Sequence, residues 1–344
     1  MEHIGIDVHK RESQVCVLGE GGQVVLEQRI ATRRDKLAEL LGKRPKARVL
    51  LEASTESEWV ARCLEELGHE VVVADPNFAS MYATRSRRVK TDKRDARTLA
   101  EANRLGAYRP AHRMSDERRQ VRAQVAVREV LVRTRTRLIN QVSAQLRQEG
   151  LRMSSGESEC FGQRVAALSL PGRLQEQVAP LLKMLKPVNE QVAALDAELE
   201  QLCRKDEQLS RLCTVPYVGP VTACAFASAV DDPQRFGSAH QVEAYLGLVP
   251  SESSSGEKQH KGRITKAGNT RVRWLLVEAA VKWLWHPRPE TEVLRVWAQG
   301  IAARGGKKKA VVALARRLAG ILFAMMRDGT EYRAPRRAVQ EAAA

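Results

Sequence analysis

The sequence predicts an α/β domain at the amino terminus, followed by a helical middle region and a mainly helical carboxy-terminal region. Three apolar segments at the start, separated by polar turns, have the length and composition of strands. Beyond them, two short apolar strands alternate with two helical segments. Three antiparallel strands followed by alternating helix and strand is the element order of RNase H-like domains. The opening strands are expected at residues 4–8, 14–18 and 24–30, the helices at 33–41 and 57–67, and the later strands at 47–51 and 70–74.

The middle region is expected to contain two helical segments. Residues 115–149 form an Arg-rich, amphipathic stretch without proline. Prolines at 171 and 187 predict a broken chain between them, with Pro187 in the first turn of a new helix. After it, apolar residues recur with the a/d spacing of a coiled coil, and packing between two helices of one chain explains that spacing as well as a dimer does. The residues are Val188, Val192, Leu195, Leu199 and Leu202.

The carboxy-terminal region opens with a turn that precedes an apolar, Ala-rich helix. The turn, residues 215–220, resembles the hairpin of a helix-hairpin-helix element, in which amides at the helix start bind a phosphate. Gly219 would let the phosphate approach the backbone. A plain tight turn between packed helices is the alternative. Residues 251–269 are expected to form a polar, flexible loop before a helix at 272–282.

Composition favours a nucleic-acid partner. Lys plus Arg exceeds Asp plus Glu by 57 − 41 = 16 in 344 residues, and such a surplus favours polyanions because each phosphate contact releases counterions. The six cysteines form no CxxC pair, so we expect reduced core residues. The opening residues carry no signal-peptide pattern, and no apolar run is long enough to span a membrane. We therefore expect a cytoplasmic protein without membrane partners.

Four carboxylates are the candidate metal ligands. Asp7 and Glu52 stand at the ends of predicted apolar strands, while Asp92 and Asp95 are three residues apart on one predicted helical face. Converging oxygen ligands of this kind hold hard cations, and a pair of such cations stabilises both oxygens of a phosphodiester displacement. Taken singly, each acid could be a strand-end or helix cap, or simply solvated. The set as a whole favours a metal site.

Basic residues crowd around the two aspartates. Cations there would offset the repulsion between carboxylates and bind a phosphate backbone, although a solvated helix face is the alternative. The residues are Arg85, Arg87, Arg88, Lys90, Lys93 and Arg94. Further along the chain, Lys261, Arg263, Lys266 and Arg273 are also expected to contact nucleic acid.

Several short segments occur together, in order, over about residues 1–325. They are Ile4-Gly5-Ile6-Asp7-Val8-His9-Lys10, Leu50-Leu51-Glu52-Ala53-Ser54, Lys90-Thr91-Asp92-Lys93-Arg94-Asp95-Ala96, residues 215–220, 247–250, Ser254-Ser255-Gly256, 262–269 and Arg273. By chemistry alone, the Ser255-Gly256 dipeptide gives weak grounds for a serine nucleophile, because no His-Asp pair lies near it. Taken together, the segments resemble the DEDD transposases of insertion-sequence family 110, which include the Piv-type DNA invertases.

The resemblance implies a RuvC-like domain whose four acids hold Mg²⁺, with Mn²⁺ as an alternative and two ions expected. It implies residues 1–110 as this domain, 111–206 as a helical, coiled-coil assembly region, 207–330 as a transposase domain and 331–344 as a basic tail. It also implies a serine nucleophile, which matches Ser255 best and Ser254 next. Donor and target DNA, a structured guide RNA from the element and a second copy of the chain, in a dimer or tetramer, are the implied partners. Such a protein acts at the prokaryotic nucleoid.

Two other functions stay open from the residues. A RuvC-like Holliday-junction nuclease or RNase H-like hydrolase needs only the acids and a water nucleophile, and it forms no covalent protein–DNA adduct. A non-catalytic nucleic-acid-binding module would tolerate loss of all four acids. The sequence leaves open whether one protomer or two supply the acids and the serine.

Overall fold

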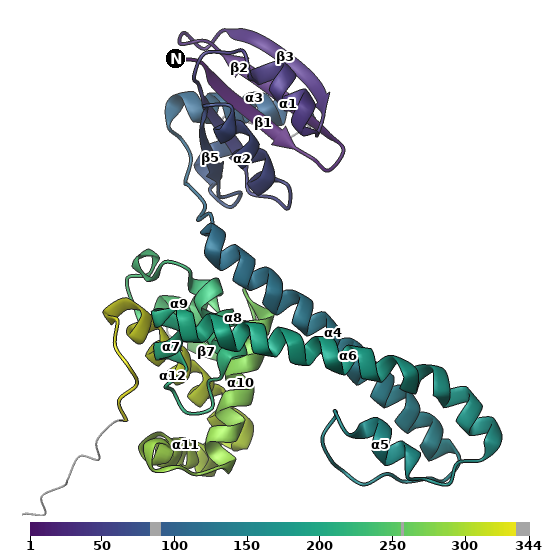
Figure 1. The fold of residues 1–344 in the computed structure, drawn as a ribbon. Coiled ribbons are helices and arrows are strands. Elements are labelled where there is room, and N and C mark those ends of the chain that lie inside the picture. The colour runs from purple at the N-terminus through teal and green to yellow at the C-terminus, as the bar shows by residue number, and fades with distance from the viewer. Residues whose placement is uncertain (83–90, 256–257, 335–344) are drawn as a thin grey trace, which may run out of the picture. The chain divides into compact units, whose positions relative to one another are not determined.

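A computed structural model of the protein describes residues 1–82, 91–255 and 258–334 (Figure 1). The chain divides into two compact units, residues 1–113 and 114–344. The first unit contains a mixed five-stranded sheet with helices, and the second is built mainly of helices. The expected order of an RNase H-like domain, a long helical region and a helical carboxy-terminal region is therefore confirmed.

The sheet of the first unit has the strand order β3-β2-β1-β4-β5. The first three strands pair antiparallel, and β4 and β5 join β1 in parallel, as the RNase H-like order requires. The predicted strand at 47–51 lies one residue further along the chain. The elements are β1 His3–Val8, β2 Glu12–Leu18, β3 Val24–Ala31, α1 Arg34–Leu41, β4 Arg48–Glu52, α2 Ser57–Glu66, β5 Glu70–Ala74, η1 Ala79–Tyr82 and α3 Asp92–Leu105.

Helices cover both faces of this sheet. Leu37 and Leu64, from α1 and α2, pack with the main core of strand residues. Helix α3 lies on the opposite face, where Ala96 and Ala100 pack against Cys16 and Leu18 of β2. The near-continuous apolar sequence of β1 and β4 follows from burial on both faces.

Helix α3 lies unusually close to β1. A Cβ atom at Gly5 would stand 2.1 Å from the Ala100 nitrogen and 2.4 Å from the Ala96 oxygen, so only glycine permits this contact. One helical turn further on, the buried Asn103 side chain donates hydrogen bonds to the carbonyls of Ile4, at 3.0 Å, and Arg48, at 2.7 Å. These contacts fix the position of α3 relative to β1 and β4.

The second unit begins with two long helices that pack against each other, α4 Asp116–Gln148 and α6 Gly172–Lys205, with the short α5 Phe161–Ala166 beside them (Figure 1). The prediction for 115–149 is confirmed. The remaining elements are α7 Glu207–Leu212, α8 Pro220–Val230, η2 Pro233–Arg235, α9 Ala239–Tyr245, β6 Pro250–Ser255, β7 Lys258–Ile264, α10 Thr270–Trp285, η3 Pro289–Thr291, α11 Glu292–Gly305 and α12 Lys307–Asp328.

The predicted break between Pro171 and Pro187 is wrong, because α6 runs through it and holds Pro180 and Pro187 in its interior. Each interior proline removes one backbone hydrogen bond, at a cost of about 3 kcal/mol. Packing compensates for that loss. Leu185 and Val188, on either side of Pro187, are both buried.

The apolar seam of α6 packs within the chain. Val188, Val192 and Leu199 are buried. Leu199 shares a core with Val121 and Val125 of α4. That core also contains residues of α8, α10 and α12, so the carboxy-terminal end of α6 belongs to the hydrophobic core of the carboxy-terminal helices. Contact between two helices of one chain accounts for the a/d spacing.

The expected flexible loop at 251–269 is also wrong, because β6 and β7 form an antiparallel hairpin in which Ser255 pairs with Lys258. Most of its residues are polar, so the alternation of apolar and polar residues that marks a half-buried strand is missing. The hairpin is held by its backbone ladder and by the Ser251 hydroxyl, which donates to the Arg263 carbonyl at 3.0 Å.

The cysteines are free, as expected, but they are not all core residues. Cys16, Cys63, Cys203 and Cys224 are buried, whereas Cys160 precedes α5 and is exposed. Among the described residues, no helix has the length and apolar character needed to cross a membrane. The proposed boundaries at 110, 206 and 330 stay predictions.

Candidate metal centre and nucleic-acid contacts

The candidate metal centre lies where β1 meets the start of α3. Asp7 is the next-to-last residue of β1, and Asp92 is the first residue of α3. The helix starts there because Thr91 is extended and its hydroxyl accepts a hydrogen bond from the Arg94 amide. The close contact at Gly5 brings the helix against the strand that carries Asp7. Two carboxylates far apart in sequence thus come together.

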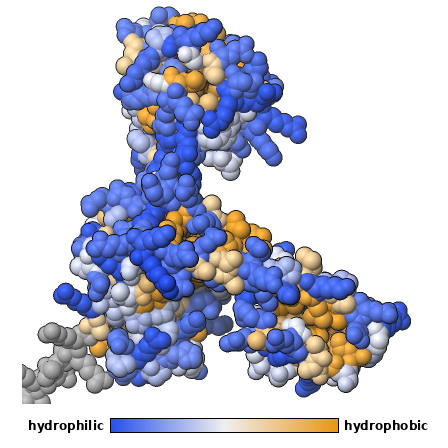
Figure 2. Space-filling model, viewed as in Figure 1, coloured by the Kyte–Doolittle hydropathy of each residue, from blue (hydrophilic) through white to orange (hydrophobic). Residues whose placement is uncertain are grey.

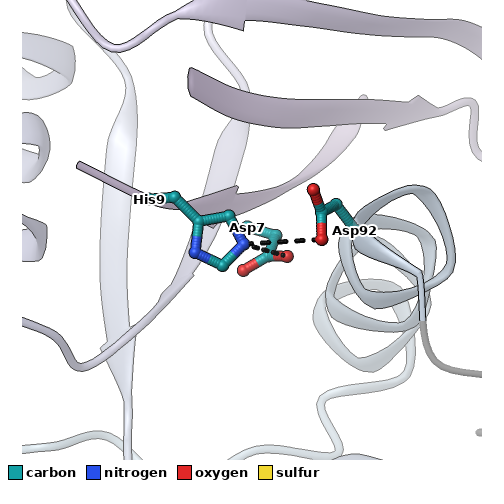
Figure 3. A group of neighbouring side chains, drawn as sticks. All are labelled: Asp7, His9 and Asp92. Carbon is teal, nitrogen blue, oxygen red and sulfur yellow. Dashed lines mark ion pairs between the residues drawn. The ribbon is translucent and has the colours of Figure 1, made fainter. Parts of the chain in front are cut away.

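His9 forms ion-pair contacts with both of these carboxylates (Figure 3). Its Nε2 atom is 3.2 Å from Asp7 Oδ2 and 3.6 Å from Asp92 Oδ1. One ligand atom from each of the three residues lies within 4.8 Å of the others, which is compatible with a shared cation. Sequence reasoning gave His9 no role. Its spacing of two residues from Asp7, which puts both side chains on one face of an extended chain, is the signal that could have found it.

The pKa of Asp7 is affected by the other three predicted acids. Burial raises the pKa of Asp7 above its ordinary value, and Asp95, Asp92 and Glu52 raise it further, while His9 opposes them. Each acid is therefore close enough to disfavour the charged form of Asp7. Glu52 ends β4, the parallel neighbour of β1, and Asp95 is half-buried one turn into α3. Several carboxylates near one partly buried carboxylate suit a hard divalent cation.

Basic side chains form ion pairs with carboxylates in and around this site. Arg29 of β3 lies 3.8 Å from Asp92 and 2.8 Å from Glu12. The predicted cation Lys93 pairs with Glu27 of β3 at 2.9 Å, and its side chain stays largely exposed. Arg94 is exposed at the start of α3. The other predicted cations of this cluster, Arg85, Arg87, Arg88 and Lys90, lie outside the described residues.

Arg273, a predicted nucleic-acid contact, has a structural role in this protein. It is buried, and its guanidinium donates to the carbonyls of Leu246 and Ala267, at 2.8 Å each, and to the Thr270 hydroxyl. These bonds hold the turn after α9 to the turn that precedes α10. An arginine whose donors serve the protein's own backbone has few left for a phosphate.

The other residues of the second unit that are predicted to contact nucleic acid remain candidates for that role. Arg263 and Lys266 are exposed, at the end of β7 and directly after it. Gly219 is the N-cap of α8, and the space that a Cβ atom would occupy there is open within 4 Å. Ser255 ends β6 and Lys261 lies in β7. A nucleic-acid role for these residues stays a prediction.

The fold and the acid cluster define a class of protein: an RNase H-like domain with carboxylates for a divalent cation, joined to a helical domain. The family follows from sequence comparison. Residues 4–150 match a transposase family of the DEDD type found in IS110 elements, and residues 209–294 match the transposase IS116/IS110/IS902 family. The chain belongs to the IS110 family of transposases, enzymes of DNA transposition.

Relatives with this description match nearly the whole chain. A probable family 20 transposase of Pseudomonas aeruginosa is 32% identical over 97% of this chain and 99% of its own length. The transposase for insertion sequence element IS1111A of Coxiella burnetii is 28% identical over 96% of this chain and 91% of its own. The transposase for IS1328 of Yersinia enterocolitica is 28% identical over 96% and 98%. The DEDD type implies a divalent metal, and a transposase binds DNA.

Proposed function

We propose that this transposase cuts and rejoins DNA by means of a divalent cation held by Asp7, Glu52, Asp92 and Asp95 and a serine nucleophile, Ser255. The observation that carries the proposal is the convergence of charged groups on Asp7. His9 is within ion-pair distance of both Asp7 and Asp92, and the charges of Glu52 and Asp95 raise the pKa of Asp7. A divalent cation bound there supplies Lewis-acid stabilisation of phosphate oxygens. The acid types fit Mg²⁺, with Mn²⁺ as the alternative.

In the proposed reaction, the Ser255 hydroxyl oxygen attacks phosphorus. An oxygen–phosphorus bond to the serine forms while the bond from phosphorus to a deoxyribose oxygen breaks. The serine loses its proton, and the leaving oxygen gains one. The resulting phosphoserine link retains the energy of the phosphodiester, so a second strand's hydroxyl can reverse the step and reseal DNA without ATP.

We further propose that the protein works as a homo-oligomer on donor and target DNA with a structured guide RNA, at the prokaryotic nucleoid. Exposed apolar side chains on the long helices support a second copy as partner: Val127 and Val130 on α4 and Met184 on α6. Figure 2 shows apolar residues gathered near α5, where these helices pack together. The net charge of +16 supports polyanionic partners beyond one duplex contact.

The test is a search for a covalent adduct. Wild-type protein with Mg²⁺, end-labelled DNA of the element and its co-transcribed RNA should give a DNA-linked protein that survives denaturation. Ser255→Ala should remove both the adduct and recombination while DNA binding persists. Ser254→Ala is the matched control, because it changes the adjacent position of the same strand. Free cut ends without an adduct would assign the cleavage to water and make the protein a hydrolytic nuclease.

A further inference from the structure

A large cavity lies at the base of the β6–β7 hairpin in the second unit. Its volume is about 1160 Å³. One wall is the hairpin base, including Pro250, Arg263 and Ile264, and another is the face of α12 from Lys308 to Arg317. Trp297 of α11, Glu243 of α9, Leu248 and Lys266 also line it. The cavity is wide enough for a nucleotide-sized group, since ligand pockets are commonly 300–1,000 Å³.

The lining is strongly basic. Six cations face one carboxylate, Glu243, which pairs with Arg316. Among the residues that the structure describes, no ion pair or side-chain hydrogen bond engages Lys308, Lys309 or Arg317. The six cations are Arg263, Lys266, Lys308, Lys309, Arg316 and Arg317. A net lining charge of about +5 suits an anion with several phosphates.

Two of these lysines occupy a position that does not favour the helix. Lys307, Lys308 and Lys309 form the first turn of α12, and no acidic residue accompanies them there. The positive end of the helix dipole repels cations at this terminus. Lysines that do not stabilise the helix are well explained by a polyanionic ligand.

Trp297 gives the cavity an aromatic wall. It remains 44% exposed although it is one of the largest apolar side chains of the protein. Leu248, Ile264 and Val312 line the same space. Aromatic rings beside a basic groove are how proteins bind single strands, because unpaired bases stack on the ring while cations follow the backbone. A duplex keeps its bases stacked on one another, so it could not use this wall.

We propose that this cavity binds an unpaired segment of DNA next to the phosphate that Ser255 attacks, with a base stacked on Trp297 and the backbone on Lys308, Lys309 and Arg317. The inference rests on the proposed function for the choice of DNA. Strand β6 links the two places: Pro250 lines the cavity and Ser255 ends the strand, about 17 Å away at about 3.4 Å per residue. A strand bound along the hairpin would thus span cavity and nucleophile.

This site extends beyond the segment that the carboxy-terminal family match covers. The match ends at residue 294, before Trp297 and before all of α12. The wall formed by Trp297 and α12 therefore lies outside the residues on which the carboxy-terminal family match rests.

The test measures affinity for a short labelled single-stranded DNA by fluorescence anisotropy, with the full chain carrying Ser255→Ala and without divalent cation. Trp297→Ala should weaken binding at least about fivefold, from the loss of one base stack. Trp297→Phe should lose less, because a ring remains. Lys308→Ala with Arg317→Ala should lower the slope of log affinity against log salt by about 1.4, or 0.7 for each phosphate contact.

Matched controls lie outside the cavity. Trp274→Ala removes another exposed tryptophan, and Arg327→Ala removes a cation at the other end of α12, where it pairs with Asp328 at 2.7 Å. Neither should alter affinity as much. Unchanged affinity in both Trp297→Ala and the Lys308–Arg317 double variant would overturn the proposal, provided circular dichroism shows folded protein.

Two further outcomes separate this proposal from the proposed function. Tighter binding of RNA of the same sequence, with the same losses in the variants, would overturn the assignment to DNA. If single-stranded DNA binding falls in Trp297→Ala but wild-type protein forms no covalent adduct with DNA, the single-strand site is supported and only the serine nucleophile fails.

Discussion

Replacing Gly5 with alanine should disable the metal centre without touching any of its ligands. The new Cβ atom would stand 2.1 Å from the Ala100 nitrogen. An ordinary separation is about 3.5 Å, so the backbone of α3 must withdraw by about 3.5 − 2.1 = 1.4 Å. The Ala100 nitrogen and the Ala96 oxygen are both backbone atoms, so no side chain can rotate away to relieve the clash. Overpacking of this kind costs about 1–3 kcal/mol of stability.

The displacement should reach Asp92. The contact at Ala96 is four residues from Asp92, or about 6 Å along the helix at 1.5 Å per residue. A helix moves largely as a unit over one turn, so the Asp92 carboxylate should shift away from Asp7 and His9. Misplacement of a catalytic group by about 1 Å can lower the rate about 100-fold. We therefore expect cleavage to fall by about two orders of magnitude in a variant that still folds.

Strand cleavage with Mg²⁺, thermal melting and calorimetric Mg²⁺ affinity would be measured side by side. Gly300→Ala is the matched control: it lies within α11 with open space at the Cβ position, so alanine should stabilise that helix by about 0.5–1 kcal/mol. Wild-type cleavage and an unchanged melt in Gly5→Ala would refute the argument that the contact of α3 with β1 sets the geometry of the site.

Three further predictions follow from single residues. Asp7→Asn should abolish cleavage yet raise the melting temperature of the metal-free protein, because it removes a desolvated charge among like charges; a lower melting temperature without metal would contradict this. Arg273→Ala should destabilise the protein by about 1.5–3 kcal/mol, through its lost charged hydrogen bonds, and leave DNA affinity unchanged once folding is corrected for. Pro187→Ala should stabilise α6, by up to about 3 kcal/mol in a urea titration, because it restores an amide donor to the Lys183 carbonyl.

The sheet and its acids could be predicted from the sequence because hydrophobic burial determines them. The apolar runs of β1, β4 and β5 are short, bounded by turns and charged at their ends, so strand positions and the places of Asp7 and Glu52 follow from local pattern. The N-cap at Thr91 likewise places Asp92 and Asp95 in the first turn of a helix.

The remaining features depend on contacts that local pattern does not encode. Proline at 187 favours a helix start locally, but packing along α6 overrides it. The polar hairpin shows no alternation, because its strands pair mainly through backbone bonds. Arg273 has the charge of a phosphate ligand, and only the three-dimensional structure reveals that it serves the backbone. The role of Gly5 depends on a helix about 90 residues away in the sequence.

The cations around Asp92 explain how the site can stay folded without a metal. Like-charged groups at close range repel, and Asp7 is additionally desolvated, so an isolated pair of carboxylates here would oppose folding. The His9 ring, from the chain after β1, lies against both Asp7 and Asp92, and Arg29 of β3 brings positive charge to Asp92. Both side chains are largely exposed, at 56% and 61%, so they can leave without opening the core. A divalent cation that binds the carboxylates can therefore displace the exposed side chains of His9 and Arg29. Its binding breaks no buried contact of these two residues.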